Sequence, residues 1–444
     1  MLEVFTIRFS WTAMWRTLQD QVLNPPLDYA VLKVFEVVDP SDATRRIVPA
    51  LWGAACVVVF GRLISRRAGP RVGVAAATFL AFAPYHVHYS QEVRPYSLGM
   101  LLTTSTLLFI DRYLDKPGWR RLLLVVCGSI AAAYTMFLAA LTLLIAGATL
   151  VLEDALLAAE PRRRAARRLL IWSPAFALAV GVAYIPWWPM LWRAIHAPAI
   201  SAPPALSFRR VGRVFSYFGF GFHDWYPLGA AGAFFIALVL LGSVLAVAKY
   251  RLRFLLAWAV IGIAAVEAME HRHGVYDAIF HLVPAGIALT GLAALPAGWL
   301  AERRHGSWLA ATLVAVVLYL DARGLAFYFE RGRPDWRPVA QFLRRQPEGE
   351  RILAAGAGIQ LCLGYYANGP DWLCCPRPGQ RSIVDIGYDA SGLWTSWKPS
   401  NGAWLVTPVS GKPTLEPLFA DVPSVVFPTA DGGVVVRHIG PHAP

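Results

Sequence analysis

Charged residues are scarce in this sequence. Only 16% of its 444 residues are Asp, Glu, Lys or Arg, whereas 57% are hydrophobic. A soluble globular protein usually carries about 25% charged and about 45–50% apolar residues. Several apolar runs are about 20 residues long, which is enough to cross a hydrocarbon core of roughly 30 Å. The shortage of charge argues against a soluble domain and predicts a polytopic membrane protein that is mainly α-helical.

Cysteine is also rare, with five residues in the chain. None of them has the CxxC or Cys/His spacing of a structural metal site. Cys362, Cys374 and Cys375 share the C-terminal segment, and whether Cys362 pairs with either of the other two stays open. The stretch 356–358 has two of the three glycines of a dinucleotide-binding loop. We expect no helix after it, so it predicts a turn.

The apolar runs that are present predict about ten membrane helices. Their boundaries are assigned from the hydrophobic pattern and from the breaks between runs. The expected helices cover residues 46–62, 73–89, 97–113, 121–135, 137–153, 169–189, 228–248, 253–269, 276–299 and 307–327.

Basic residues give the chain a net charge of +13 and collect in short loops. The segments 61–73, 111–121, 160–168, 249–253 and 301–306 hold 18 Lys and Arg within 44 residues. Such loops face the cytoplasm in membrane proteins, so the surplus indicates orientation rather than nucleic-acid binding. Both chain ends then lie outside the cell. An outer N-terminus with no helix before it leads us to expect one more membrane helix upstream of Met1.

Three regions follow from this topology. Residues 1–45 form an outer amphipathic segment with a Pro-Pro loop, and residues 46–328 form the transmembrane bundle. Residues 329–444 are richer in Pro and Gly and form a small α/β extracytoplasmic domain. In that domain we expect a helix over residues 335–345 and β-rich runs at 351–355, 359–366, 382–386, 404–408, 424–427 and 433–439.

The stretch from Pro84 to Tyr96 gathers polar side chains between two apolar helices. It contains two histidines, Glu92, Arg94 and several aromatic residues. Ionisable groups at a membrane helix end are costly unless they face water or do chemistry. His86 and His88 are two positions apart and point to different helix faces, so we expect satisfied interface histidines rather than a metal pair. The stretch therefore predicts the border of a functional site.

Four motifs carry a family resemblance. They are Glu3-Val4-Phe5-Thr6, Asn24-Pro25-Pro26-Leu27-Asp28-Tyr29, Ser90-Gln91-Glu92-Val93-Arg94-Pro95-Tyr96 and Asp335-Trp336-Arg337. In this order they resemble motifs of the GT-C superfamily of polyprenyl-phosphate-sugar-dependent glycosyltransferases. The bacterial family 39-like group, related to protein O-mannosyltransferases and aminoarabinose transferases, is the most similar branch.

The resemblance implies sugar transfer from a polyprenyl-phosphate donor to an unknown acceptor at the outer face of a bacterial cytoplasmic membrane. Glu3 and Glu92 would be the catalytic acids. Arg94 and Arg272 would bind the donor phosphate, because a guanidinium binds phosphate bidentately. The remaining candidates for substrate binding are Tyr96, Asn24, Asp28 and His273. The resemblance also leaves a divalent metal near the first acid open.

Two departures from the family pattern keep alternatives open. Leu2 stands where the family has its catalytic Asp, and Asn24 stands where it has a His. The first alternative is a catalytically impaired protein or scaffold of the same fold. The second is a transporter or flippase, which would have paired inverted repeats and broken helices at the midplane. The sequence shows no internal repeat, and its polar residues collect at helix ends.

Overall fold

The computed structural model describes residues 2–20, 24–196, 214–215, 217–220, 230–273, 283–331, 336–346, 350–354, 357–368, 383–385, 403–408, 422, 424–427 and 434–439. The chain divides into two compact units. Residues 15–325 form a helical bundle, and residues 1–14 with 326–444 form a unit that contains the sheet. The predicted class, mainly α with a small α/β domain, is confirmed.

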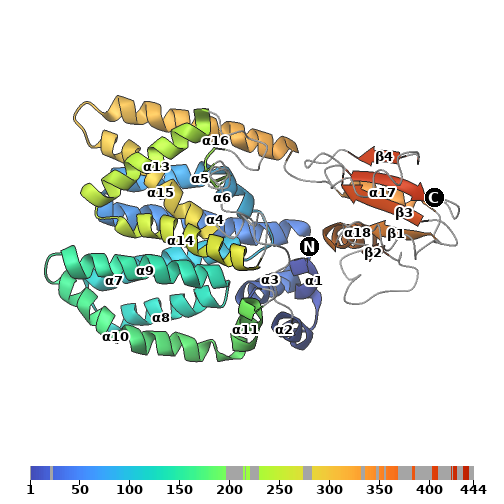
Figure 1. The fold of residues 1–444 in the computed structure, drawn as a ribbon, viewed down its shortest axis with the longest axis horizontal. Helices are drawn as coiled ribbons and strands as arrows, with labels where there is room; N and C mark the ends of the chain where they lie inside the picture. The colour runs from blue at the N-terminus through green and yellow to red at the C-terminus, as the bar shows by residue number, and fades with distance from the viewer. Residues whose placement is uncertain are drawn as a thin grey trace. The chain divides into compact units, whose positions relative to one another are not determined.

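The first unit is an array of helices that Figure 1 shows lying roughly side by side. They are α3 (Leu27–Val38), α4 (Asp42–Ala68), α5 (Pro70–Phe82), α6 (Pro84–Tyr89), α7 (Tyr96–Asp115), α8 (Trp119–Ala133), α9 (Phe137–Leu157), α10 (Arg162–Ala183), α11 (Trp188–His196), α13 (Ala230–Ala248), α14 (Arg253–His273), α15 (Val283–Ala301) and α16 (Ser307–Arg331). Among the described residues, six helices are long and apolar enough to cross a membrane, namely α4, α9, α10, α13, α15 and α16.

The structure has a helix at the place of each of the ten predicted runs. The prediction of one helix over residues 73–89 is wrong, because two helices lie there. The structure ends α5 at Phe82 and starts α6 at Pro84. Pro84 has no backbone N–H to continue the ladder, and the residue before a proline is driven out of the helical region. Ala83 has ψ of 120° accordingly. The break makes the first half of the polar stretch a short helix of its own.

The centre of the bundle is α15, which packs against α5, α13 and α14. Residues Val283–Gly298 are all buried, and a helix that is apolar on every face belongs inside a bundle. Small residues allow the neighbouring backbones to approach. A Cβ added at Gly242 of α13 would lie 1.8 Å from the Leu292 carbonyl oxygen, so this crossing admits only glycine.

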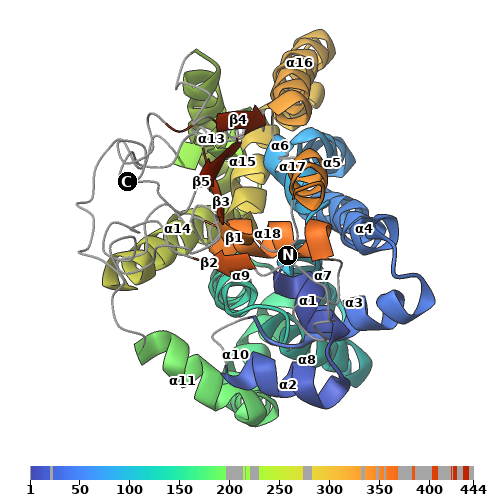
Figure 2. The same cartoon turned by 90° about the vertical axis from the view of Figure 1, so that its right-hand side faces the viewer.

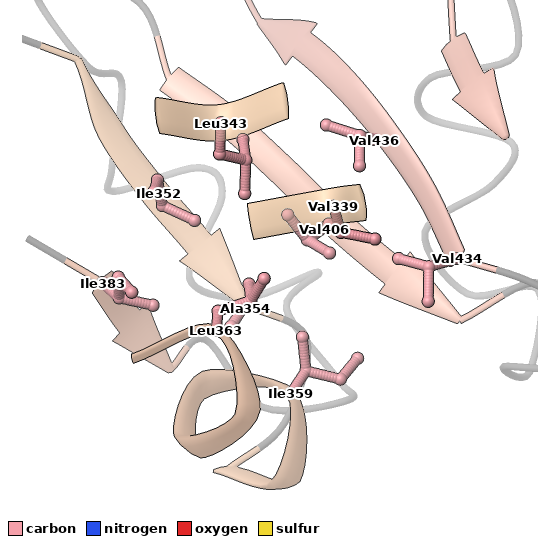
Figure 3. Close-up of a cluster of buried hydrophobic side chains, with 10 residues drawn as sticks. All are labelled: Val339, Leu343, Ile352, Ala354, Ile359, Leu363, Ile383, Val406, Val434 and Val436. Atoms are coloured by element: carbon pink, nitrogen blue, oxygen red, sulfur yellow. The ribbon is translucent and has the colours of Figure 1, made fainter. Parts of the chain in front are cut away.

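The second unit is built on a sheet of β1 (Arg351–Ala354), β2 (Ile383–Asp385), β3 (Ala403–Pro408), β4 (Ser424–Phe427) and β5 (Val434–Ile439). The strand order is β2-β1-β3-β5-β4, with β1 parallel to β2 and β3, and β5 antiparallel to β3 and β4. Figure 3 shows the core, where Val339 and Leu343 of α17 (Arg337–Arg344) meet Ile352 and Val406 of the strands.

One predicted strand of this unit is wrong. Residues 359–366 belong to the helix α18 (Ala357–Asn368), which joins β1 to its parallel neighbour β2. Two parallel strands need a crossover, which is usually a helix, so the topology overrides the apolar run. The expectation that no helix follows residues 356–358 is wrong for the same reason. Cys362 lies in α18 as a free thiol, and Cys374 and Cys375 fall outside the described residues.

The N-terminal segment forms two short helices, α1 (Leu2–Arg8) and α2 (Trp11–Asp20). In the second unit, the Phe5 ring of α1 packs edge-on against Tyr365 of α18, with ring centroids 6.1 Å apart. In the first unit, α2 meets the short 3-10 helix Ile185–Trp187 that precedes α11, as the Trp15 and Trp187 rings lie 4.8 Å apart. Figure 2 shows α2 and α11 side by side.

Candidate active site

The second half of the predicted polar stretch forms a turn between α6 and α7, which we call the motif turn, residues 90–95. Helix α6 has six residues, so it spans only about 9 Å and does not cross a membrane. Pro84 begins α6 and Pro95 is the N-cap of α7. Prolines suit these starting positions because the first N–H groups of a helix have no partner within it. Pro84 therefore fixes where α6 starts, and Pro95 fixes where the motif turn passes into α7.

Serine side chains fix this turn to the bundle. Ser90 Oγ donates to the His86 carbonyl at 2.6 Å, and Ser97 Oγ donates to the Tyr89 carbonyl at 2.6 Å. Ser90 also packs directly on Gly53 of α4, where an added Cβ would lie 2.0 Å from Ser90 Oγ. The first residue of the motif is therefore a packing residue, and Gly53 is the small residue that it requires.

Glu92 is held beside His88 and Arg94. Its Oε1 lies 3.0 Å from His88 Nε2, and its side chain is 33% exposed. Burial raises the pKa of Glu92, but the hydrogen bond from His88 and the charge of Arg94 outweigh burial, so the pKa lies below its ordinary value. The carboxylate is thus ionised at neutral pH. Such a group suits orienting a neighbour better than taking a proton.

Arg94 is exposed on the same turn. Its backbone N–H donates to the Glu92 carbonyl at 2.8 Å, and its Nη1 donates to the Tyr96 hydroxyl at 3.4 Å. The Tyr96 ring itself is buried and meets the Tyr89 ring edge-on at 4.8 Å. Tyr96 therefore presents its hydroxyl rather than its ring face, and that hydroxyl orients the guanidinium.

The two histidines differ. His88 has a carboxylate partner, as expected of a satisfied interface histidine. His86 does not fit that expectation, because it is 3% exposed and its Nε2 has no hydrogen-bond partner among the described residues. Burial lowers the pKa of His86 to about 4, so the ring is neutral at pH 7. Among the described residues, no group of three His, Cys, Asp or Glu could hold a metal ion.

Tyr217 is a residue that the sequence analysis missed. Its hydroxyl hydrogen-bonds to that of Tyr89, which brings a distant segment of the chain to the motif turn. The neighbouring Phe218 ring packs edge-on against Tyr85 at 5.0 Å. The aromatic residues at 215–220 could have drawn attention to this segment, but the sequence does not show which residues they contact.

The Pro-Pro motif also packs inside the bundle. Pro26 is the N-cap of α3, and the Leu27 N–H donates to the Tyr134 carbonyl at 2.9 Å, at the break between α8 and α9. Asp28 and Tyr29 are buried, whereas Asn24 is half-buried. A buried carboxylate at the start of α3 is favoured by the positive end of the helix dipole.

Several predicted site residues fall outside what the structure describes. Glu3 lies in α1, and Arg272 and His273 lie in the last turn of α14, but their side chains are outside the described part of the chain. Asp335 is outside it as well. The structure therefore brings together Glu92, Arg94 and Tyr96, and leaves the roles of the other candidates as predictions.

The far end of α7 carries a second polar cluster, which we call the ion cluster. It consists of Arg66, Arg67, Asp111, Asp115, Glu153, Asp154, Arg162 and Arg253. Asp111 accepts from Arg66 at 2.7 Å, from Arg67 at 2.9 Å and from Arg162 at 2.5 Å. These residues come from α4, α7, α9, α10 and α14, so the cluster ties five helices together. It contains as many acids as bases.

The helical bundle followed by an α/β unit is the GT-C fold seen in solved membrane glycosyltransferases. The resemblance drawn from the sequence is supported by a family model that covers two of the four motifs, those at residues 24–29 and 90–96. Residues 24–188 match the family model described as dolichyl-phosphate-mannose-protein mannosyltransferase. A search among curated proteins found no match.

Solved structures with this fold include ArnT from Cupriavidus metallidurans. Its apo structure has a TM-score of 0.54 and 14% identity, covering 94% of this chain and 87% of that chain. Its structure bound to undecaprenyl phosphate has a TM-score of 0.51 and 14% identity, covering 94% and 88%. An Archaeoglobus fulgidus oligosaccharyltransferase in complex with Zn and sulfate gives a TM-score of 0.47 and 13% identity, covering 78% and 53%. At 14% identity the likeness to ArnT concerns the fold alone.

Proposed function

We propose that this chain transfers a sugar from a polyprenyl-phosphate donor to an acceptor at the outer face of a bacterial cytoplasmic membrane, with its C-terminal unit extracytoplasmic. The observation that carries the proposal is the motif turn, where an exposed guanidinium is oriented by a phenol beside an ionised carboxylate. The fold supports it, since a neighbour of the same fold was solved with undecaprenyl phosphate bound.

The reaction needs a cation where the lipid phosphate leaves. An acceptor oxygen attacks the anomeric carbon, a new C–O bond forms, and the bond from that carbon to the phosphate oxygen breaks. The acceptor's proton passes to a base, for which Glu3 is our candidate. The lipid phosphate departs with both bonding electrons, and Arg94 stabilises its growing negative charge. Arg272 is our second candidate for contact with the phosphate. Our candidates for substrate binding are Tyr96, Asn24, Asp28 and His273.

Glu92 has a positioning role in this proposal. Its carboxylate pairs with His88 and attracts the Arg94 guanidinium, so it helps to keep Arg94 in place. A carboxylate with a lowered pKa is a weak base, so proton transfer falls to another group. Direct attack from the far side of the sugar ring would invert the anomeric carbon.

The test is sugar transfer by membranes that contain the chain, with a polyprenyl-phosphate sugar as donor. Arg94→Ala should lower kcat/KM about 100-fold or more, as removal of a charge-stabilising donor does elsewhere. Arg94→Lys keeps the charge but loses the planar fork, so its loss should be smaller. Arg112→Ala is the matched control, because Arg112 is an exposed arginine in the last turn of α7, at the end opposite the motif turn. Wild-type rates from Arg94→Ala would overturn the site.

A protein of the same fold without transferase activity is the second candidate. Leu2 and Asn24, in place of an acid and a histidine, favour it. It predicts that undecaprenyl phosphate binds with an affinity that depends on Arg94, while no sugar is transferred under any acceptor condition. Binding and transfer measured on one preparation separate the two candidates.

A further inference from the structure

Tyr89 lies at the centre of an aromatic chain that reaches the motif turn. Its side chain is 3% exposed, and its hydroxyl pairs with the hydroxyl of Tyr217. Its ring meets Tyr96 edge-on at 4.8 Å and His88 edge-on at 4.7 Å. Tyr96 in turn accepts the hydrogen bond from Arg94 Nη1. A continuous path of contacts therefore joins Tyr217 to the Arg94 guanidinium.

The segment that carries Tyr217 is anchored on several helices of the same unit. Phe218 packs on Tyr85 of α6 and on Gly286 of α15, where an added Cβ would lie 2.5 Å from its ring. Phe220 meets Phe235 of α13 at 5.6 Å, and its carbonyl oxygen lies against Gly324 of α16. Because protein interiors are close-packed, these contacts fix the position from which Tyr217 reaches Tyr89.

We propose that Tyr217 is a positioning residue that sets the orientation of Arg94 through Tyr89 and Tyr96. The inference rests on the proposed function, in which Arg94 binds the lipid phosphate. In this proposal neither the Tyr217 ring nor the Tyr89 ring touches the donor. Their hydroxyl pair fixes the Tyr89 ring, the Tyr89 ring supports Tyr96, and the Tyr96 hydroxyl aims the guanidinium.

A hydroxyl pair of this kind has a distinctive signature. Removing one hydroxyl takes a hydrogen-bond partner away from the other, which is costly where that hydroxyl is shielded from water. Removing both leaves two apolar edges of nearly the same shape, and such double replacements are often close to neutral. Tyr89→Phe and Tyr217→Phe should therefore each weaken the site, and the double variant should recover.

The experiment measures binding of undecaprenyl phosphate to the purified full-length chain in detergent. We expect each single variant to bind about 5- to 10-fold more weakly, and the double variant to lie within about twofold of wild type. In the transfer assay the same variants should lower kcat as well as raise KM for the donor, because Arg94 stabilises charge that grows in the transition state. Tyr113→Phe is the matched control, since Tyr113 is a buried tyrosine near the other end of α7.

Arg94→Ala in the same assay separates this inference from the proposed function. If Arg94→Ala binds the lipid normally, the proposed function fails. If Arg94→Ala loses binding while both single tyrosine variants keep wild-type affinity, only the role of Tyr217 fails. A double variant in which the losses of the singles add, instead of recovering, also overturns the pairing.

Discussion

Charged side chains are arranged differently at the two ends of α7. Tyr96 begins the helix and Asp111 lies near its other end, a separation of about 22 Å at 1.5 Å per residue. At the Asp111 end, acids and guanidiniums pair with one another in matched numbers, and Asp111 is 1% exposed. At the Tyr96 end, the Arg94 guanidinium is exposed and meets a neutral phenol.

The difference separates two uses of arginine within one bundle. In the ion cluster, Arg66, Arg67 and Arg162 neutralise a buried carboxylate and hold helices together. In the motif turn, Arg94 is exposed, so a ligand can reach its guanidinium from solvent. We therefore expect substitutions in the ion cluster to change stability, and substitutions in the motif turn to change binding and catalysis.

Asp111→Asn gives the largest expected effect. It leaves three guanidiniums facing a neutral amide, and breaking a buried ion pair in this way costs about 3–5 kcal/mol. Chemical unfolding in detergent should show the loss, while the folded fraction still binds undecaprenyl phosphate. The exposed pair of Glu160 with Arg164 supplies the control, because Glu160→Gln should cost under about 0.5 kcal/mol. Equal unfolding midpoints for both variants would contradict the comparison.

Gly53→Ala tests the packing beneath the motif turn. The new methyl group would overlap Ser90 Oγ, so the turn has to shift, with a destabilisation of about 1–3 kcal/mol. Transfer activity should fall together with stability. Gly181→Ala is the matched control, since nothing lies within 4 Å of its added Cβ in α10. Alanine there should stabilise the helix by about 0.5–1 kcal/mol, and a loss instead would refute the steric argument.

Glu92→Gln gives the smallest expected effect, which should appear as a change in how stability depends on pH. The pKa of Glu92 is lowered in the folded state, so its carboxylate contributes stability above its unfolded pKa of about 4.3. That contribution is lost as the pH falls through the folded pKa. Thermal unfolding should therefore show wild type more stable than Glu92→Gln by up to about 1 kcal/mol at pH 7. The two curves should converge as the pH falls from about 4.3 through the lower folded pKa of Glu92, and a gap that widens toward acid would contradict this account.

The helices and the motif turn were predictable because hydrophobic runs and sequence-local motifs carry them. Pro84 was visible as well, yet the apolar run on both sides of it suggested one helix where there are two. Residues 359–366 are apolar enough for a strand, and only the parallel pairing of β1 with β2 requires the helix that is there. The pairing of strands depends on residues that are far apart in the sequence, so a local hydrophobic pattern does not predict it.

Contacts between distant segments were not predictable. Tyr217 reaches Tyr89 across 128 positions, and Arg67 reaches Asp154 across 87. The basic residues of the ion cluster were noticed only as an orientation signal, because the acids that neutralise them lie on other helices. Glu92 was expected among the catalytic acids, and its lowered pKa depends on His88 and Arg94 in their folded positions.

The burial of Asp111 has a practical consequence for handling the protein. Dissolved ions weaken attractions between charges that face water, but they reach enclosed pairs much less. Raising the ionic strength of a purification buffer should therefore strip loosely held anions from the Arg94 surface while the helix ends around Asp111 stay joined. A salt wash is thus a gentle way to clear small exchangeable anions from Arg94 before any measurement of affinity.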